Sequence, residues 1–317
     1  MRLVTHVTAG AERPGALVPD GDRERLLDLS PALGDGVTVT DVLADPALTA
    51  RARDAVGQAE ADTTALAALP WADDARLAPP VRPGKILCLG YNYRGHVPDG
   101  QDPTTDDPEF PDVFVKTPNT LSGPHDVITV PPVADDVDYE GEIAVVIGRR
   151  AHRVGVEDAM DHVAGYALFD DVSDRSWQRR SSQWTMGKCL DGFGQLGPAV
   201  VTADEVADFH DLTVEVERDG VVTVSQSTST MVFRLPFLVH YLSQVMTLEP
   251  GDVISTGTPQ KLPEALAAHR PLVHGDAVTI RVAGLGALTT RFAGAYPETS
   301  GPARAGAATP STEGVHA

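Results

Sequence analysis

Short apolar runs bounded by glycine, proline or aspartate recur along this chain and predict a structure made mainly of strands. The expected strands are residues 3–7, 85–90, 113–116, 142–148, 165–169, 212–217, 253–256 and 278–282. Asp219-Gly220 lies between two apolar alternations and predicts a two-residue hairpin turn. Helical patterns are fewer and lie at about residues 45–69, 156–162, 174–180 and 235–246.

The order of these elements limits the fold class. Because the strands outnumber the helices and do not alternate with them regularly, a doubly wound parallel sheet is disfavoured. We predict an α+β fold, with a mixed, rolled β-sheet in a catalytic domain at residues 81–295. Residues 1–80 predict a small N-terminal α/β domain, and prolines and glycine at 79–84 form the break after it. Residues 296–317 are rich in Gly, Pro, Ala, Ser and Thr, which predicts a flexible tail.

Composition excludes several classes of partner. The formal net charge is −20, from 25 basic and 45 acidic residues among 317. Nucleic acids and anionic membranes need a basic footprint, so neither is an expected partner. Cys88 and Cys189 suggest no disulfide framework, the N-terminus lacks the apolar core of a signal peptide, and no apolar run is long enough for a membrane span. We therefore expect a cytoplasmic protein.

Two glutamates at the start of an apolar strand are the first candidate for chemistry. Glu140 and Glu142 are two residues apart, so in a strand both side chains point to the same face. Such a pair repels unless a cation lies between the carboxylates, and all-oxygen ligands favour Mg²⁺, Mn²⁺ or Ca²⁺. The alternative is a solvated acidic strand edge. An EF-hand loop is excluded, because the required acidic twelfth position holds Ile147.

Further polar residues lie at the ends of other predicted strands. His96, with Asp99 three residues beyond, can be a general base with its orienting acid, or a surface histidine. Alternation turns Lys116 inward toward an anion, unless its strand is an edge facing water. One of the adjacent pair Asp170 and Asp171 can join the glutamates, and we expect the other at the N-terminus of the following helix.

Together these segments closely resemble the fumarylacetoacetate hydrolase family over roughly residues 81 to 292, in the family's order. The matching segments are residues 90–96, 114–116, 138–148, 165–175, 187–193, 250–259, 274–276 and 284–286. The resemblance implies the family's fold, preceded by the small N-terminal domain of many bacterial members. It also suggests a homodimer.

The resemblance implies roles for individual residues. It makes Glu140, Glu142 and Asp171 the ligands of a divalent metal, Mg²⁺ or else Mn²⁺ or Ca²⁺. The implied catalytic residues are His96, Asp99 and Lys188. The residues implied to contact the substrate are Tyr93, Lys116, Arg175, Gln178 and Thr258.

Four positions depart from the family's usual residues. Asp170 stands where asparagine is usual, Ser176 where aspartate is common, Cys189 where serine is expected and Gln195 where proline is frequent. None of them removes a metal ligand. They put the substrate in more doubt than the metal.

We predict metal-dependent hydrolysis of a carbon–carbon bond in a small anionic β-diketo acid of the acylpyruvate or fumarylacetoacetate type. His96 would activate the attacking water, and Lys188 with the metal would stabilise the enolate left behind. The alternatives at the same site are decarboxylation of oxaloacetate and isomerisation or hydration of 2-hydroxyhepta-2,4-diene-1,7-dioate, because a fold does not decide its chemistry. A non-catalytic protein that keeps the fold is the third interpretation.

Overall fold

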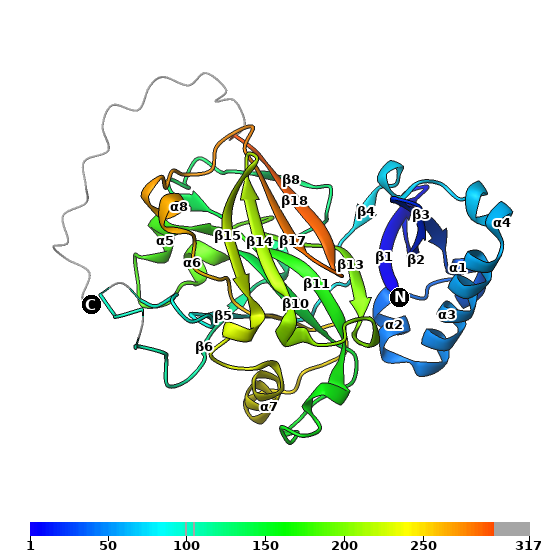
Figure 1. The fold of residues 1–317 in the computed structure, drawn as a ribbon, viewed down its shortest axis with the longest axis horizontal. Coiled ribbons are helices and arrows are strands. Elements are labelled where there is room, and N and C mark those ends of the chain that lie inside the picture. Colours follow the sequence, from blue (N-terminus) through cyan, green and yellow to red (C-terminus); the bar gives the residue numbers. More distant parts are fainter. Residues whose placement is uncertain (99, 104, 295–317) are drawn as a thin grey trace, which may run out of the picture.

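The computed structural model describes residues 1–98, 100–103 and 105–294, and two packed β-sheets form its centre (Figure 1). The strands of the larger sheet are β1 (Arg2–Thr8), β2 (Ala11–Asp20), β3 (Arg23–Asp28), β4 (Leu77–Ala78), β5 (Ile86–Gly90), β6 (Asp112–Lys116), β7 (Leu121–Ser122), β10 (Gly141–Ile147), β11 (Val163–Asp171), β13 (Gly194–Thr202) and β16 (Val253–Ser255). The strands of the smaller sheet are β8 (Val127–Thr129), β14 (Thr213–Arg218), β15 (Val221–Ser227), β17 (Ala277–Val282) and β18 (Gly286–Ala293). A separate short pair is formed by β9 (Val137–Asp138) and β12 (Ser173–Asp174).

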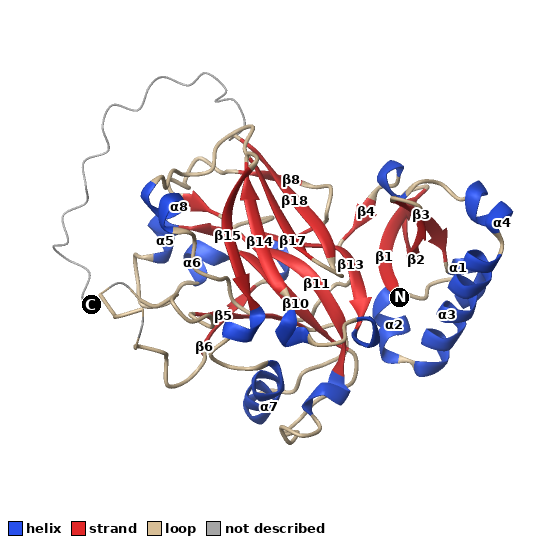
Figure 2. Cartoon of the chain, viewed as in Figure 1, coloured by secondary structure: helices blue, strands red, loops and turns tan. Residues whose placement is uncertain are grey.

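Most of the helices are short, and they lie around the sheets, as Figure 2 shows. They are α1 (Ser30–Leu33), α2 (Val39–Ala44), α3 (Pro46–Ala61), α4 (Thr63–Ala68), α5 (Arg175–Gln178), α6 (Thr185–Lys188), α7 (Leu235–Val245) and α8 (Pro263–Ala267). In the part of the chain that the structure describes, no helix is long and apolar enough to cross a membrane.

Strand pairing makes the larger sheet a mixed one. Its order is β3-β2-β1-β13-β11-β10-β16-β5-β6, with β4 beside β1 and β7 beside β13. The pairs β5–β16 and β7–β13 are parallel, whereas β10 pairs antiparallel with both β11 and β16. The predicted α+β fold with a mixed sheet is confirmed.

The N-terminal part of the chain adds three antiparallel strands to this sheet. Strand β1 pairs with β2 on one side and with β13 on the other, where Arg2 lies opposite Val201. The helical pattern at residues 45–69 forms α3 and α4, separated at Asp62, whose side chain accepts hydrogen bonds from the Thr64 and Ala65 N–H groups and caps α4. The domain division at residue 80 stays a prediction, and the predicted tail at 296–317 lies outside the described residues.

The other helix expectations have mixed outcomes. The patterns at residues 174–180 and 235–246 form α5 and α7. The helix expected at residues 156–162 was wrong, because only a single 3₁₀ turn, Ala159–His162, forms there. The Asp219-Gly220 hairpin is confirmed between β14 and β15, where Arg218 pairs with Val221.

Strand β10 is buried along its whole length because both of its faces are covered. Ile143, Val145 and Ile147 pack into the core between the two sheets. Ala144 and Val146 belong to a second core on the opposite face, together with apolar residues of α1 to α3. A strand that is buried on both faces has a continuous apolar sequence, and the sequence of β10 has this pattern.

Candidate active site

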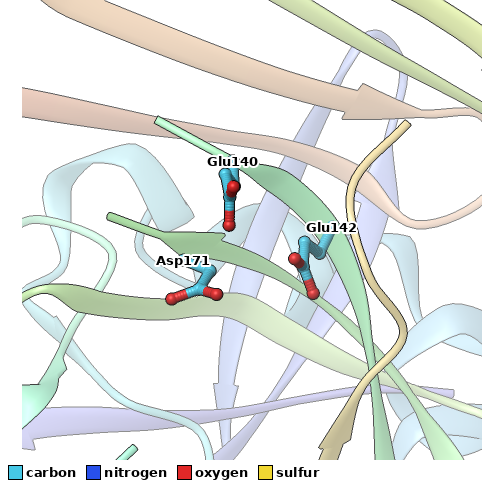
Figure 3. A group of neighbouring side chains, drawn as sticks. All are labelled: Glu140, Glu142 and Asp171. Carbon is cyan, nitrogen blue, oxygen red and sulfur yellow. The ribbon is translucent and has the colours of Figure 1, made fainter. Parts of the chain in front are cut away.

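Strand alternation brings three carboxylates to one face of the larger sheet. Glu142 in β10 has the same parity as Ala144, so its side chain points toward the second core, and Glu140 precedes it by two residues. On the neighbouring strand β11, Asp171 has the parity of Phe169, which also lies in the second core. The three carboxyl groups face a common space (Figure 3).

This group has the composition and spacing of a divalent-metal site. One oxygen from each of Glu140, Glu142 and Asp171 lies within 4.8 Å of the others. Ligands on opposite sides of an ion with metal–oxygen distances of 2.0–2.6 Å are about 4–5 Å apart. The donor set is all oxygen and buried, so the residues fit a hard divalent cation.

Asp170 corrects one expectation, because it does not lie at a helix N-terminus. Its side chain points to the opposite face of β11, is fully buried, and accepts a hydrogen bond from the Glu140 N–H at 3.2 Å. The residue that caps α5 is Asp174, which accepts from the Trp177 N–H at 3.0 Å. Burial raises the pKa of Asp170 to about 7. Asp170 therefore holds the backbone of a candidate ligand from behind.

Two buried lysines offset the negative charge of the carboxylates. The Lys188 ammonium, at the end of α6, donates to Glu140 and, at 2.7 Å, to Asp171. The Lys116 ammonium donates to the other oxygen of Asp171 at 2.6 Å and to the Val172 carbonyl at 2.9 Å. The expectation that Lys116 faces inward toward an anion is confirmed, and the anion is Asp171 itself.

The two glutamates have opposite electrostatic environments. Burial acts against ionisation of Glu140, but Arg175 and Lys188 outweigh it and hold the pKa of Glu140 far below its usual range. Burial, followed by repulsion from Asp171 and Glu140, raises the pKa of Glu142 well above its usual range. Glu142 accepts hydrogen bonds from the Ser255 hydroxyl and the Gly257 N–H. A bound cation would supply the positive charge that this carboxylate requires.

His96 lies on the loop after β5 with its ring oriented by the backbone. Its Nδ1 is 2.9 Å from the carbonyl oxygen of Thr258. Because a carbonyl oxygen only accepts, Nδ1 carries the hydrogen and Nε2 is left as the basic nitrogen. Burial lowers the pKa of His96, against the opposing effect of the Thr258 hydrogen bond. The predicted orienting acid, Asp99, lies outside the described residues, and its role stays a prediction.

A cavity of about 450 Å³ opens over these groups. Of the residues expected at the site, those that line this cavity are His96, Glu140, Glu142, Arg175, Gln178, Lys188 and Thr258. Arg175 bridges Glu140 and Asp138 and donates to Gln178 at 2.9 Å. Asp171 and Lys116 lie behind the cavity wall, and Tyr93 is fully buried away from the cavity.

An aromatic wall that the sequence did not reveal closes one side of the cavity. Trp184 packs edge to face against Tyr91 and Phe114, with ring centroids 5.6 and 5.4 Å apart. Gly90 permits this contact, because a Cβ at that position would lie 2.6 Å from the Trp184 ring. The strand pattern gave no signal for Trp184, which lies on a loop. A second group that sequence reasoning missed is Gln260 with Lys261, beyond Thr258.

The sequence that forms this mixed β-sheet and its carboxylate-lined cavity is similar to those of known proteins. Residues 85–293 match the model of the fumarylacetoacetate (FAA) hydrolase C-terminal region. The mitochondrial oxaloacetate tautomerase FAHD2A of Bos taurus is 41% identical to this chain over 233 residues, which are 72% of each chain. The oxaloacetate tautomerase fahd2, mitochondrial, of Xenopus laevis is 37% identical over 278 residues, 82% of this chain and 85% of that one.

Solved structures of the same kind of protein are also similar to this chain. A fumarylacetoacetate hydrolase from Exiguobacterium antarcticum has a TM-score of 0.75 and 29% identity, over 93% of this chain and 99% of that one. A 5-carboxymethyl-2-hydroxymuconate delta-isomerase from Mycobacterium smegmatis has a TM-score of 0.71 and 29% identity, over 93% and 100%. The chain belongs to the fumarylacetoacetate hydrolase family, whose members are enzymes.

Proposed function

We propose that this protein catalyses divalent-metal-dependent enolisation of a 2-oxo acid, and that its reaction is keto–enol tautomerisation of an oxaloacetate-type substrate. The observation that carries the proposal is that one cavity is lined by two carboxylates of the triad, with Asp171 behind them, by a histidine whose ring the backbone orients, and by a buried ammonium. The names of the relatives that are about 40% identical support the choice of reaction.

The chain's own residues account for the proton movements. His96 Nε2 takes a proton from C3 of the keto form, and the C3–H electron pair becomes the C2=C3 bond. The carbonyl π electrons move to the C2 oxygen, which takes a proton from solvent, while His96 returns its proton to solvent. Lys188 stabilises the charge that develops on this oxygen, and Arg175 binds the anionic substrate. A divalent ion held by Glu140, Glu142 and Asp171 would supply Lewis-acid stabilisation of the same charge.

Hydrolysis of an acylpyruvate is the second candidate. It is favoured by the likeness to a solved fumarylacetoacetate hydrolase over 93% of this chain. The same His96 nitrogen would then activate a water molecule rather than take a carbon-bound proton. Mg²⁺ (or Mn²⁺ or Ca²⁺) as the ion, a homodimer and a cytoplasmic location remain predictions.

The test compares EDTA-treated protein with and without added Mg²⁺ or Mn²⁺ on two substrates. Tautomerisation predicts a metal-restored acceleration of the decay of oxaloacetate enol absorbance, above the rate with metal alone. Hydrolysis predicts release of pyruvate and acetate from acetylpyruvate. If neither reaction responds to metal in a protein that binds the metal, the proposal is wrong.

A further inference from the structure

A second cavity of about 190 Å³, here called the side lobe, adjoins the main cavity. The lobe and the main cavity share lining residues, which include His96, Glu140, Arg175 and Gln260. The residues that line the lobe but not the main cavity are Asp138, Tyr139, Pro259, Lys261 and His269. The lobe therefore adjoins the part of the main cavity where Glu140 and Arg175 lie.

Lys261 lines the lobe and has no part in the site described so far. Its ammonium pairs with Asp138 and lies 3.9 Å from the centroid of the Tyr139 ring. The side chain is 13% exposed. An ammonium has three N–H donors. Within the described residues, the Lys261 ammonium donates one side-chain hydrogen bond, to Asp138. A donor therefore remains for an oxygen atom that enters the lobe.

The lobe is also connected to the metal ligands at short range. One nitrogen of Arg175 donates to Asp138 at 3.0 Å and to Glu140 at 2.6 Å, so these two carboxylates are direct neighbours. Asp138 thus joins Lys261 to the site where a 2-oxo carboxylate would bind. In a four-carbon diacid only two carbon atoms separate the carboxylates, a separation that suits neighbouring subsites.

The charges of the lobe favour an anion. Its cationic lining residues are Arg175, Arg179 and Lys261, against the anions Asp138 and Glu140. Coordination of an ion by Glu140 would engage one of the two anions and increase the positive excess. A locally cationic lobe in a chain of net charge −20 is unlike its surroundings.

We propose that Lys261, assisted by Gln260, binds a second carboxylate of the substrate and so selects 2-oxo diacids over 2-oxo monoacids. The inference rests on the proposed function and names the residues that decide its substrate class. Lys261 is a specificity residue in this scheme and not a proton-transfer residue.

The experiment compares wild type with Lys261→Met, Gln260→Leu and a matched control, Lys85→Met. Lys85 forms the same kind of ion pair, with Asp252, but lines neither cavity. Turnover is measured with oxaloacetate and with its 4-ethyl ester, which has lost the second charge. Equilibrium binding to the Mg²⁺-loaded protein is measured with 3,3-difluoro-oxaloacetate, which has no C3 hydrogen and does not tautomerise, and with its 4-ethyl ester.

We expect Lys261→Met to weaken difluoro-oxaloacetate binding and to lower kcat/KM for oxaloacetate by about 10- to 100-fold, the effect of one charge-assisted hydrogen bond. The ester values should change less than about 3-fold, and Lys85→Met should change neither. Gln260→Leu should give a smaller loss in the same direction, which keeps the test valid if Lys261→Met does not fold.

Equal losses for diacid and ester, or no loss, would overturn the inference. Failure of the proposed function gives a different result, namely absence of oxaloacetate turnover by the wild type. In that case binding alone decides: a wild-type preference for the diacid that Lys261→Met removes supports the subsite, and equal binding of diacid and ester refutes it.

Discussion

Replacement of Glu142 by glutamine tests the carboxylate triad with little change of shape. The substitution keeps an oxygen that can accept from the Ser255 hydroxyl and the Gly257 N–H, but removes one charge and one metal ligand. The structure predicts that the variant is more stable than the wild type without metal and that metal stabilises it less.

Without metal, the variant should be the more stable protein. The carboxylate oxygens of the triad lie within 4.8 Å of one another. Two unit charges at that distance repel by about 3.5 kcal/mol at an effective dielectric constant of about 20. Lys188 and Arg175 offset part of this repulsion through Glu140, so we expect a gain of roughly 1–3 kcal/mol, or about 2–10 °C in Tm.

With metal, the advantage of the variant should shrink by at least about 1.3 kcal/mol. An ion at about 100 times its dissociation constant stabilises the wild type by about 2.7 kcal/mol. Loss of one of three protein ligands should weaken binding at least tenfold, which leaves about 1.4 kcal/mol or less at the same ion concentration. The assay is thermal denaturation at pH 8 in EDTA and in a Mg²⁺ or Mn²⁺ series.

The control is Glu157→Gln, which removes the same charge from an exposed position outside the cavity. It should leave both the Tm in EDTA and the metal-induced shift as in wild type. A Glu142→Gln protein that is less stable in EDTA and keeps the full metal-induced shift would refute the assignment of the triad as a metal site.

Three further substitutions test other parts of the site. His96→Gln should lower kcat by about 10²–10⁴-fold and leave the metal-induced Tm shift unchanged. Because burial lowers the pKa of His96, the acid limb of the wild-type pH–rate profile should have its midpoint below pH 6.5, and a midpoint above that value would contradict the role. Lys116→Met should cost about 3–5 kcal/mol in urea unfolding, since it leaves a buried Asp171 short of a partner, and an unchanged midpoint would contradict this. Asp170→Asn should raise the Tm in EDTA by removing a buried charge with an unpartnered oxygen, worth about 1–3 kcal/mol, and a lower Tm would count against it.

The alternation of strand residues was enough to predict the core of the candidate site. Period-two reasoning placed Glu140 and Glu142 on one face and allowed one member of the Asp170–Asp171 pair to join them, and the structure brings Asp171 to them. The parity of β11 decides which aspartate joins, because Leu168 and Phe169 pack into cores on opposite faces of the sheet. That choice required knowledge of which face each core covers.

The parts that the sequence did not predict have identifiable physical causes. Strand β2 was missed because Pro14, Gly15 and Pro19 interrupt its apolar pattern, and proline and glycine normally count against a strand. Trp184 and Lys261 lie on loops, where no periodicity fixes the direction of a side chain. Their positions depend on long-range packing, such as the contact of Trp184 with Gly90.

The four departures from the family pattern have a different meaning once they are located. Within the described residues, none of Asp170, Ser176, Cys189 and Gln195 lines the main cavity or its side lobe. Ser176 donates to Asp174 at 2.6 Å, and the Gln195 amide donates to the Gly123 and Asp126 carbonyls at 2.9 and 3.0 Å. These residues support the backbone around the ligands, so they bear on the stability of the site more than on the substrate. Gln260 and Lys261 are polar residues beyond the expected set that line the side lobe, and the choice of substrate is therefore best tested at that loop.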